Sequence, residues 1–256
     1  MPTRLTFIIT GFGPFGPVSA NPTQLLLESL QPKGDAARPT SPLLAALPPS
    51  LAGRVTSATV LPVSLAAARA WAASEAEQQQ GGGGGQASLT LALHLGVNAE
   101  SSGGGFCLEA AAYNTANFRL PDADGACPAC GPIEAGVAGG AARTSGVPVE
   151  RLVERLVRAG AARRVGFGSR CCRPAVAAGS PAVAASPAPL PPPVRVSTCA
   201  GRYLCNFLYY LSLGLQGAGR LSLFVHVPPA EAVSIGDQAA FLAALMQACV
   251  EELEGV

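Results

Sequence analysis

Histidine and charged residues are scarce in this sequence, and both shortages restrict what the protein can do. The 256 residues include two histidines, one tryptophan and 13% charged side chains, with a formal net charge of +1. Proteins that bind nucleic acids or anionic membranes use clustered Lys and Arg, whereas the basic residues here are mostly scattered. The composition therefore argues against nucleic-acid and membrane partners.

Long apolar runs and a secretory signal are also missing. No run of about 18 apolar residues is free of polar, Gly or Pro interruptions, as a membrane-spanning helix requires. No small-residue cleavage site follows the strand-like segment Leu5–Thr10. Eight cysteines without a secretory signal indicate reduced thiols rather than a disulfide framework. We therefore expect a cytoplasmic protein.

Three segments have a low-complexity composition. Lys33–Ser50 is rich in Pro, Ala and Leu, which predicts an extended surface loop, and residues 78–86 contain the run QQQGGGGG. Residues 161–193 are rich in Ala, Pro, Ser and Gly with little periodicity, which predicts a disordered insertion. We expect residues 1–256 to form one domain that these segments interrupt.

Outside these segments, helix patterns and strand patterns alternate along the chain. Ser88–Val97 is apolar nearly throughout, as in the centre of a parallel sheet. Residues 149–159 have leucine and valine at helical spacing. The alternation predicts an α/β fold, in which helices cover both faces of a mainly parallel sheet. Further strands are predicted at 5–10, 55–63 and 221–227, and further helices at 21–30, 65–77, 203–213 and 235–252.

The two histidines have different surroundings. His94 lies within the apolar strand pattern LALHLGV, which is typical of a core histidine with a satisfied hydrogen bond. His226 lies at the end of a predicted strand, in LFVHVPP. Ligands of α/β proteins bind at the carboxyl ends of the strands, so His226 is the better functional candidate.

Cys205 is the candidate nucleophile. It lies in AGRYLCNFLYYLSL, in the first turn of a predicted helix, where the helix dipole stabilises a thiolate. The free N–H groups of that turn could hold an oxyanion, and His226 follows 21 residues later as a base. The alternative interpretation of Cys205 is a small buried core residue.

A carboxylate could complete such a site by orienting the imidazole. Glu109, in FCLEAAAYN, follows the third predicted strand and has apolar neighbours, among which a carboxylate needs a partner. The alternative interpretation is a surface glutamate.

Two other motifs point to different chemistry. Residues 11–16, GFGPFG, match the G-x-G-x-x-G fingerprint of dinucleotide binding, but Pro14 interrupts the turn and the helix starts later. Phe12 and Phe15 could instead line a small-molecule pocket or fold onto the core.

The second motif is a pair of cysteines separated by two residues. Cys127 and Cys130 have zinc-knuckle or redox spacing, and Cys171 and Cys172 could complete a set of four thiolates. Because the latter two are adjacent and lie in the predicted insertion, we expect no zinc site.

Taken together, these motifs resemble pyroglutamyl peptidase I, the pyrrolidone-carboxylate peptidase family, in the family's order and over roughly two-thirds of the chain. The wording of FRLPD and TSGVPV is most similar to plant and bacterial members. The matching segments are TGFGPFG and NP within 10–22, LPV at 61–63, LHLGV at 93–97, LEAAAYNTANFRLPD at 108–122, TSGVPVERLVERL at 144–156, AGRYLCNFLYYLSL at 200–213 and LFVHVPP at 223–229.

The resemblance implies a fold, a site and a reaction. The implied fold is a three-layer α/β/α sandwich of the phosphorylase/hydrolase-like type, without cofactor or metal. The implied catalytic triad is Cys205, His226 and Glu109. Phe12 and Phe15 would pack against the pyrrolidone ring of the substrate, and Asn21 would be a further substrate-binding residue. The implied reaction removes an N-terminal pyroglutamyl residue from peptides through a thiol acyl-enzyme, and the family includes monomers and homo-oligomers.

Two departures from the family keep an alternative open. Cys199 stands where the family usually has an acidic residue, and Gly103–Gly105 replaces bulkier residues ahead of Glu109. The first hypothesis is a working cysteine peptidase. The alternative is a catalytically weak homologue that keeps the fold and binds pyroglutamyl peptide ends. A nucleotide-binding oxidoreductase is a third hypothesis, for which no acidic ribose ligand is found.

Overall fold

A seven-stranded sheet forms the centre of the fold. The structure is a computed structural model that describes residues 4–16, 18–28, 41–81, 88–98, 105–165, 191–217 and 219–255. The strands are β1 (Arg4–Phe12), β2 (Val55–Leu61), β3 (Ser88–Val97), β4 (Phe106–Glu109), β5 (Ala111–Tyr113), β6 (Ala142–Thr144), β7 (Arg163–Arg164), β8 (Pro193–Ser197) and β9 (Arg220–Val227).

The strand order is β2-β1-β3-β9-β4-β8-β7, and a separate pair is formed by β5 and β6. All neighbours in the large sheet are parallel except β4 and β9, which are antiparallel. β3 lies between β1 and β9 and is buried from Leu91 to Gly96. The mainly parallel sheet with a central apolar strand is therefore confirmed.

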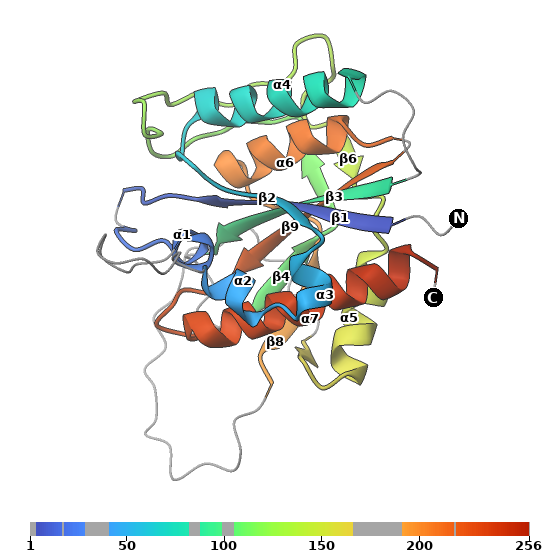
Figure 1. The fold of residues 1–256 in the computed structure, drawn as a ribbon. Helices are drawn as coiled ribbons and strands as arrows, with labels where there is room; N and C mark the ends of the chain where they lie inside the picture. The colour runs from blue at the N-terminus through green and yellow to red at the C-terminus, as the bar shows by residue number, and fades with distance from the viewer. Residues whose placement is uncertain are drawn as a thin grey trace, which may run out of the picture.

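Helices cover both faces of the sheet (Figure 1). The pair α4 and α6 lies on one face, and the other helices lie on the opposite face (Figure 1). Each face has its own hydrophobic cluster, so the predicted three-layer α/β/α architecture is confirmed. The helices are α1 (Pro22–Leu27), α2 (Pro42–Ala46), α3 (Pro49–Ala52), α4 (Leu65–Gly81), α5 (Val149–Arg158), α6 (Leu204–Gly214) and α7 (Ile235–Leu253).

The prediction of an extended surface loop at Lys33–Ser50 is wrong for its described part. The Ser41 side chain caps α2 by accepting a hydrogen bond from the Leu44 backbone, and α2 packs against α7. Leu43 is fully buried in the core. Proline at the first helical position is compatible with a helix start, so the Pro-rich composition concealed two short helices.

Parts of the other two low-complexity segments belong to helices or strands. Residues 78–81 continue α4, and residues 163–164 and 193 belong to strands at the edge of the sheet. The remaining parts, 82–86 and 166–190, lie outside the described residues. Among the helices that the structure describes, none is both long enough and apolar enough to cross a membrane.

Candidate active site

Cys205, His226 and Glu109 come from three different elements and meet in space. Nδ1 of His226, near the carboxyl end of β9, lies 2.8 Å from Glu109 Oε1 at the end of β4. Cys205, in the first turn of α6, lies close enough to the imidazole to raise the pKa of His226. Because Nδ1 is engaged by Glu109, Nε2 is the ring nitrogen left to exchange a proton with the thiol.

The surroundings of His226 make its imidazole more basic. Burial by itself lowers the pKa of His226, but the charge and hydrogen bond of Cys205 and those of Glu109 raise it well above its usual value. The arrangement places a basic imidazole beside the thiol, as a nucleophile and its base require. His226 and Glu109 are 8% and 1% exposed, whereas Cys205 is half-buried and can be reached by a substrate.

The position of the thiol depends on Gly96 in β3. A Cβ atom at residue 96 would lie 3.0 Å from Cys205 Sγ and 2.7 Å from Cζ of Phe224. The register of the sheet pairs Gly96 with His226, so the glycine leaves room for the sulfur beside the imidazole. This packing gives the glycine of the LHLGV motif a physical role that sequence reasoning had not assigned.

The entry into α6 leaves its first N–H groups available. Gly201 has a φ of +80°, a conformation that favours glycine, and the chain then enters the helix at Leu204. The N-cap residue, Tyr203, forms no side-chain cap. Within the described residues, the N-cap side chain therefore leaves backbone donors of this turn uncapped, and they could hold an oxyanion.

Glu109 is fixed through its backbone as well as through His226. The Tyr209 hydroxyl donates a hydrogen bond to the Glu109 carbonyl oxygen at 2.7 Å. Within the described residues, Oε2 of Glu109 is buried and has no hydrogen-bond partner. Of the glycines that precede it, Gly105 packs against Pro193, and Gly103 and Gly104 lie outside the described residues.

Aromatic rings gather beside the nucleophile. The Phe15 and Tyr203 ring centroids are 6.1 Å apart, and those of Phe118 and Tyr203 are 4.4 Å apart. Phe12 is 4% exposed and belongs to the hydrophobic cluster that these rings join. Sequence reasoning singled out Phe12 and Phe15 but missed Phe118 and Tyr203, although Tyr203 is only two residues before the nucleophile.

Asn21 holds the loop 11–16 in place. Its Nδ2 donates to the Gly13 carbonyl at 2.9 Å, and its Oδ1 accepts from the Thr23 backbone at 3.0 Å as the N-cap of α1. A Cβ atom at Gly11 would lie 2.9 Å from the Thr23 carbonyl oxygen, so this glycine permits close packing of strand and helix. These contacts give Gly11 and the carbonyl of Gly13 structural roles in this loop. The substrate-binding role of Asn21 stays a prediction.

His94 is a core residue, as its sequence context indicated. It is fully buried and lies 2.7 Å from the Thr10 hydroxyl and 2.8 Å from the Ser212 hydroxyl. Burial, and then the positive charge of Arg220, lower the pKa of His94 to about 3, so the ring is neutral at physiological pH.

Within the described residues, Cys127 and Cys130 do not belong to a group of potential metal ligands. Across the described ranges, no three His, Cys, Asp or Glu side chains form a group that could hold a metal ion. Cys171 and Cys172 lie outside the described residues.

The curated relatives and the solved structures that resemble this chain carry the names of pyroglutamyl or pyrrolidone carboxyl peptidases. No family model matches the chain. Over 63 residues it is 51% identical to "Pyroglutamyl-peptidase 1" of Mus musculus, and over 60 residues 48% identical to the Homo sapiens protein of that name. These matches cover 25% and 23% of this chain, and they span 28% and 26% of those relatives' length.

Solved structures match over nearly the whole chain. A pyrrolidone carboxyl peptidase from Thermus thermophilus is 25% identical with a TM-score of 0.58, covering 98% of this chain and 100% of that one. A pyrrolidone carboxyl peptidase from Pyrococcus furiosus is 22% identical with a TM-score of 0.63, covering 97% and 99%. The second likeness shows a common fold.

Proposed function

We propose that this chain, which has the fold and the sequence motifs of the pyrrolidone carboxyl peptidases, is a cysteine peptidase that removes N-terminal pyroglutamyl residues from peptides. The observation that carries the proposal is the contact of His226 with Glu109 at 2.8 Å, beside the Cys205 side chain that also raises the pKa of the imidazole. Its nucleophile lies at the start of a helix whose first N–H groups remain available. A nucleophile, a base and an orienting carboxylate are the parts that acyl transfer requires.

The reaction proceeds through an acyl-enzyme. The Cys205 thiolate attacks the pyroglutamyl carbonyl carbon, and the N–H groups of the first turn of α6 stabilise the oxyanion that forms. The imidazolium of His226 gives its proton to the leaving amine as the C–N bond breaks. His226, now neutral, takes a proton from water, which attacks the thioester and releases pyroglutamate. Glu109 holds the imidazole orientation throughout.

The aromatic rings of Phe15, Tyr203 and Phe118 suit a neutral and compact lactam ring. A residue with a free α-amino group would bring a charge into this apolar surrounding, and its desolvation is costly without a partner. This cost supports selection of pyroglutamyl over ordinary N-terminal residues.

The site also bears on the weaker hypotheses. An intact triad favours a working enzyme over a homologue that only binds pyroglutamyl peptide ends. The internal contacts of the GFGPFG loop give no support to an oxidoreductase. The six cysteines within the described residues are free thiols, which is consistent with the cytoplasmic location that we propose.

The test is hydrolysis of a fluorogenic pyroglutamyl amide by the purified, reduced protein. A prolyl amide and the Cys205→Ala variant serve as controls. We expect turnover of the pyroglutamyl amide alone, and none from the variant. If folded, reduced protein binds a pyroglutamyl peptide without turnover, the binding homologue is the correct hypothesis.

A further inference from the structure

Cys127 and Cys130 have no role in the proposed reaction, yet both are exposed free thiols. They are separated by Pro128 and Ala129, the two-residue spacing at which vicinal thiols in proteins undergo thiol–disulfide exchange. Exposure matters because a small disulfide must reach the attacking thiolate.

The two cysteines lie on a long loop that is fixed to the body of the protein on both sides. On one side, Ala116 and Gly131 form a two-way backbone bridge, and the Phe118 N–H donates to the Pro128 carbonyl at 3.0 Å. The 127–130 segment is therefore hydrogen-bonded directly to the part of the loop that carries Phe118.

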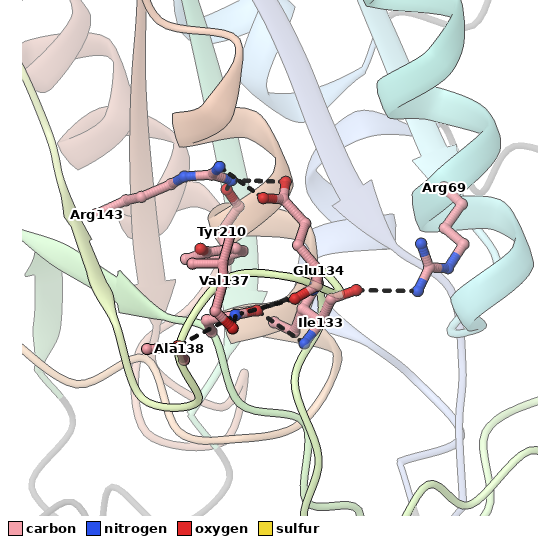
Figure 2. Close-up of polar contacts among 8 residues, drawn as sticks. Arg69, Ile133, Glu134, Val137, Ala138, Arg143 and Tyr210 are labelled. Carbon is pink, nitrogen blue, oxygen red and sulfur yellow. Dashed lines mark hydrogen bonds and ion pairs between the residues drawn. The ribbon is translucent and has the colours of Figure 1, made fainter.

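On the other side, the loop is anchored through residues 133–138 (Figure 2). The Asn114 side chain accepts from the Ile133 and Glu134 backbones, each at 2.8 Å. Glu134 pairs with Arg143, and Arg69 of α4 donates to the Ile133 carbonyl at 3.3 Å. These contacts hold residues 133–134 to the body of the protein.

The segment is linked to the active site by direct contacts. Cys127 Sγ donates to the Phe118 carbonyl at 3.4 Å, and the Phe118 ring packs on that of Tyr203. The Tyr203 hydroxyl donates to the Pro121 carbonyl of the same loop at 3.2 Å, and Tyr203 is the N-cap of the helix that carries Cys205. Tyr203 therefore connects the loop that carries Cys127 with the helix that carries Cys205.

The charges around Tyr203 agree with this geometry. Burial, and then the negative charges of Asp122, Cys127 and Cys205, raise the pKa of the Tyr203 hydroxyl. Both sulfur atoms are therefore close enough to affect the same side chain.

We propose that Cys127 and Cys130 are a modification site that forms a disulfide by exchange with low-molecular-weight disulfides, and that this disulfide alters the aromatic wall of the active site. One thiolate attacks a sulfur of the small disulfide and releases one small thiolate. The second cysteine then attacks the resulting mixed disulfide and releases the other. The protein dithiol is oxidised by two electrons, and the small disulfide is reduced to two thiols.

Closing the disulfide removes the hydrogen that Cys127 Sγ donates to the Phe118 carbonyl, because the sulfur then bonds to Cys130. Phe118 then shifts against Tyr203, while the contact between His226 and Glu109 stays unchanged. The effect should therefore fall on KM more than on kcat. This kinetic part of the inference rests on the proposed function, whereas formation of the disulfide does not.

The chemical test uses the full chain incubated with mixtures of oxidised and reduced glutathione. After alkylation of the free thiols, trypsin cleavage at Arg119 and Arg143 releases residues 120–143, which contain Cys127 and Cys130 and no other cysteine. We expect an internal disulfide in this peptide under conditions in which Cys205 is still alkylated. Its absence at every glutathione ratio would overturn the proposal, whether or not the protein is a peptidase.

The kinetic test compares the oxidised wild type with Cys130→Ser. This variant cannot form the disulfide but keeps Cys127 and its contact with Phe118. We expect a several-fold, thiol-reversible rise in KM for a pyroglutamyl amide in the wild type and none in Cys130→Ser. Equal changes in both proteins would show oxidation of another thiol, such as Cys205, and would overturn the coupling to the active site, as would a disulfide without kinetic effect.

Discussion

Replacing Gly96 with alanine should displace the nucleophile without touching its chemistry. The new Cβ atom would lie 2.7 Å and 2.9 Å from two carbons of the Phe224 ring and 3.0 Å from Cys205 Sγ. Favourable contacts between carbon atoms begin at about 3.5 Å, so something must move by several tenths of an ångström. The question is whether the ring or the sulfur moves.

The Phe224 ring has little freedom to move. It is fully buried, and its centroid lies 5.7 Å from that of Tyr209, 6.2 Å from that of His94 and 4.9 Å from that of His226. Cys205 is half-buried on a helix end, so the thiol shifts more easily. A displacement of about 1 Å at a reacting group costs roughly 100-fold in rate. We expect kcat to fall by roughly 10- to 100-fold, with about 1–3 kcal/mol of destabilisation from overpacking.

The measurement is kcat for a pyroglutamyl amide together with urea unfolding of the same preparations. Gly53→Ala is the matched control, because a Cβ atom there would make only an ordinary contact of 3.6 Å with the Pro49 carbonyl oxygen. Gly53 also has helical backbone angles that alanine adopts. If Gly96→Ala keeps the kcat and the stability of Gly53→Ala, the assignment of Gly96 as the residue that positions the thiol is wrong.

Three further predictions concern a core histidine, the orienting carboxylate and a helix cap. The pKa of His94 is lowered to about 3 in the folded protein, against 6.5 ordinarily, so below pH 6.5 the unfolded chain binds the extra proton and the free energy of unfolding falls by about 1.4 kcal/mol per pH unit. His94→Gln should remove this slope between pH 6.5 and 5 in urea unfolding, relative to the wild type. His226, whose folded pKa is raised, contributes stability that is lost as pH rises above 6.5, and it contributes equally to both proteins. Glu109→Gln should lower kcat by roughly 10²- to 10⁴-fold while thermal unfolding shows a folded protein, because the amide no longer stabilises the imidazolium; an unchanged kcat would exclude Glu109 from the triad. Asn21→Ala should cost about 0.5–2 kcal/mol in urea unfolding, whereas Asn21→Ser should cost less, because serine also caps helices; equal losses would argue against the capping role.

Sequence patterns predicted the long elements of this fold because those elements carry their own signal. The apolar run of β3 and the helical spacing of α5 are local properties of the chain. β4 has only four residues and exists through pairing with β8 and β9, so no local pattern reveals it. Its antiparallel pairing with β9, which brings Glu109 to His226, could not be predicted for the same reason.

The same distinction applies to the site. Cys205 and His226 could be found because a helix start and a strand end are visible in the sequence. The contact of Gly96 with Cys205 depends on the register between β3 and β9, and the bond from Tyr209 to Glu109 joins positions 100 residues apart. Asn21 bonds to the loop 11–16 and the start of α1, and these contacts could not be predicted from its spacing; its contact with a substrate stays a prediction.

The most direct test of the central claim is to trap the acyl-enzyme. The reduced protein would be mixed with a pyroglutamyl amide, quenched in acid within the first turnover and digested with trypsin for mass spectrometry. The peptide 203–220 contains Cys205 and no other cysteine. We predict that this peptide gains the mass of one pyroglutamyl group, and that Cys205→Ala shows neither the adduct nor turnover. Turnover that persists in Cys205→Ala would contradict the assignment of Cys205 as the nucleophile.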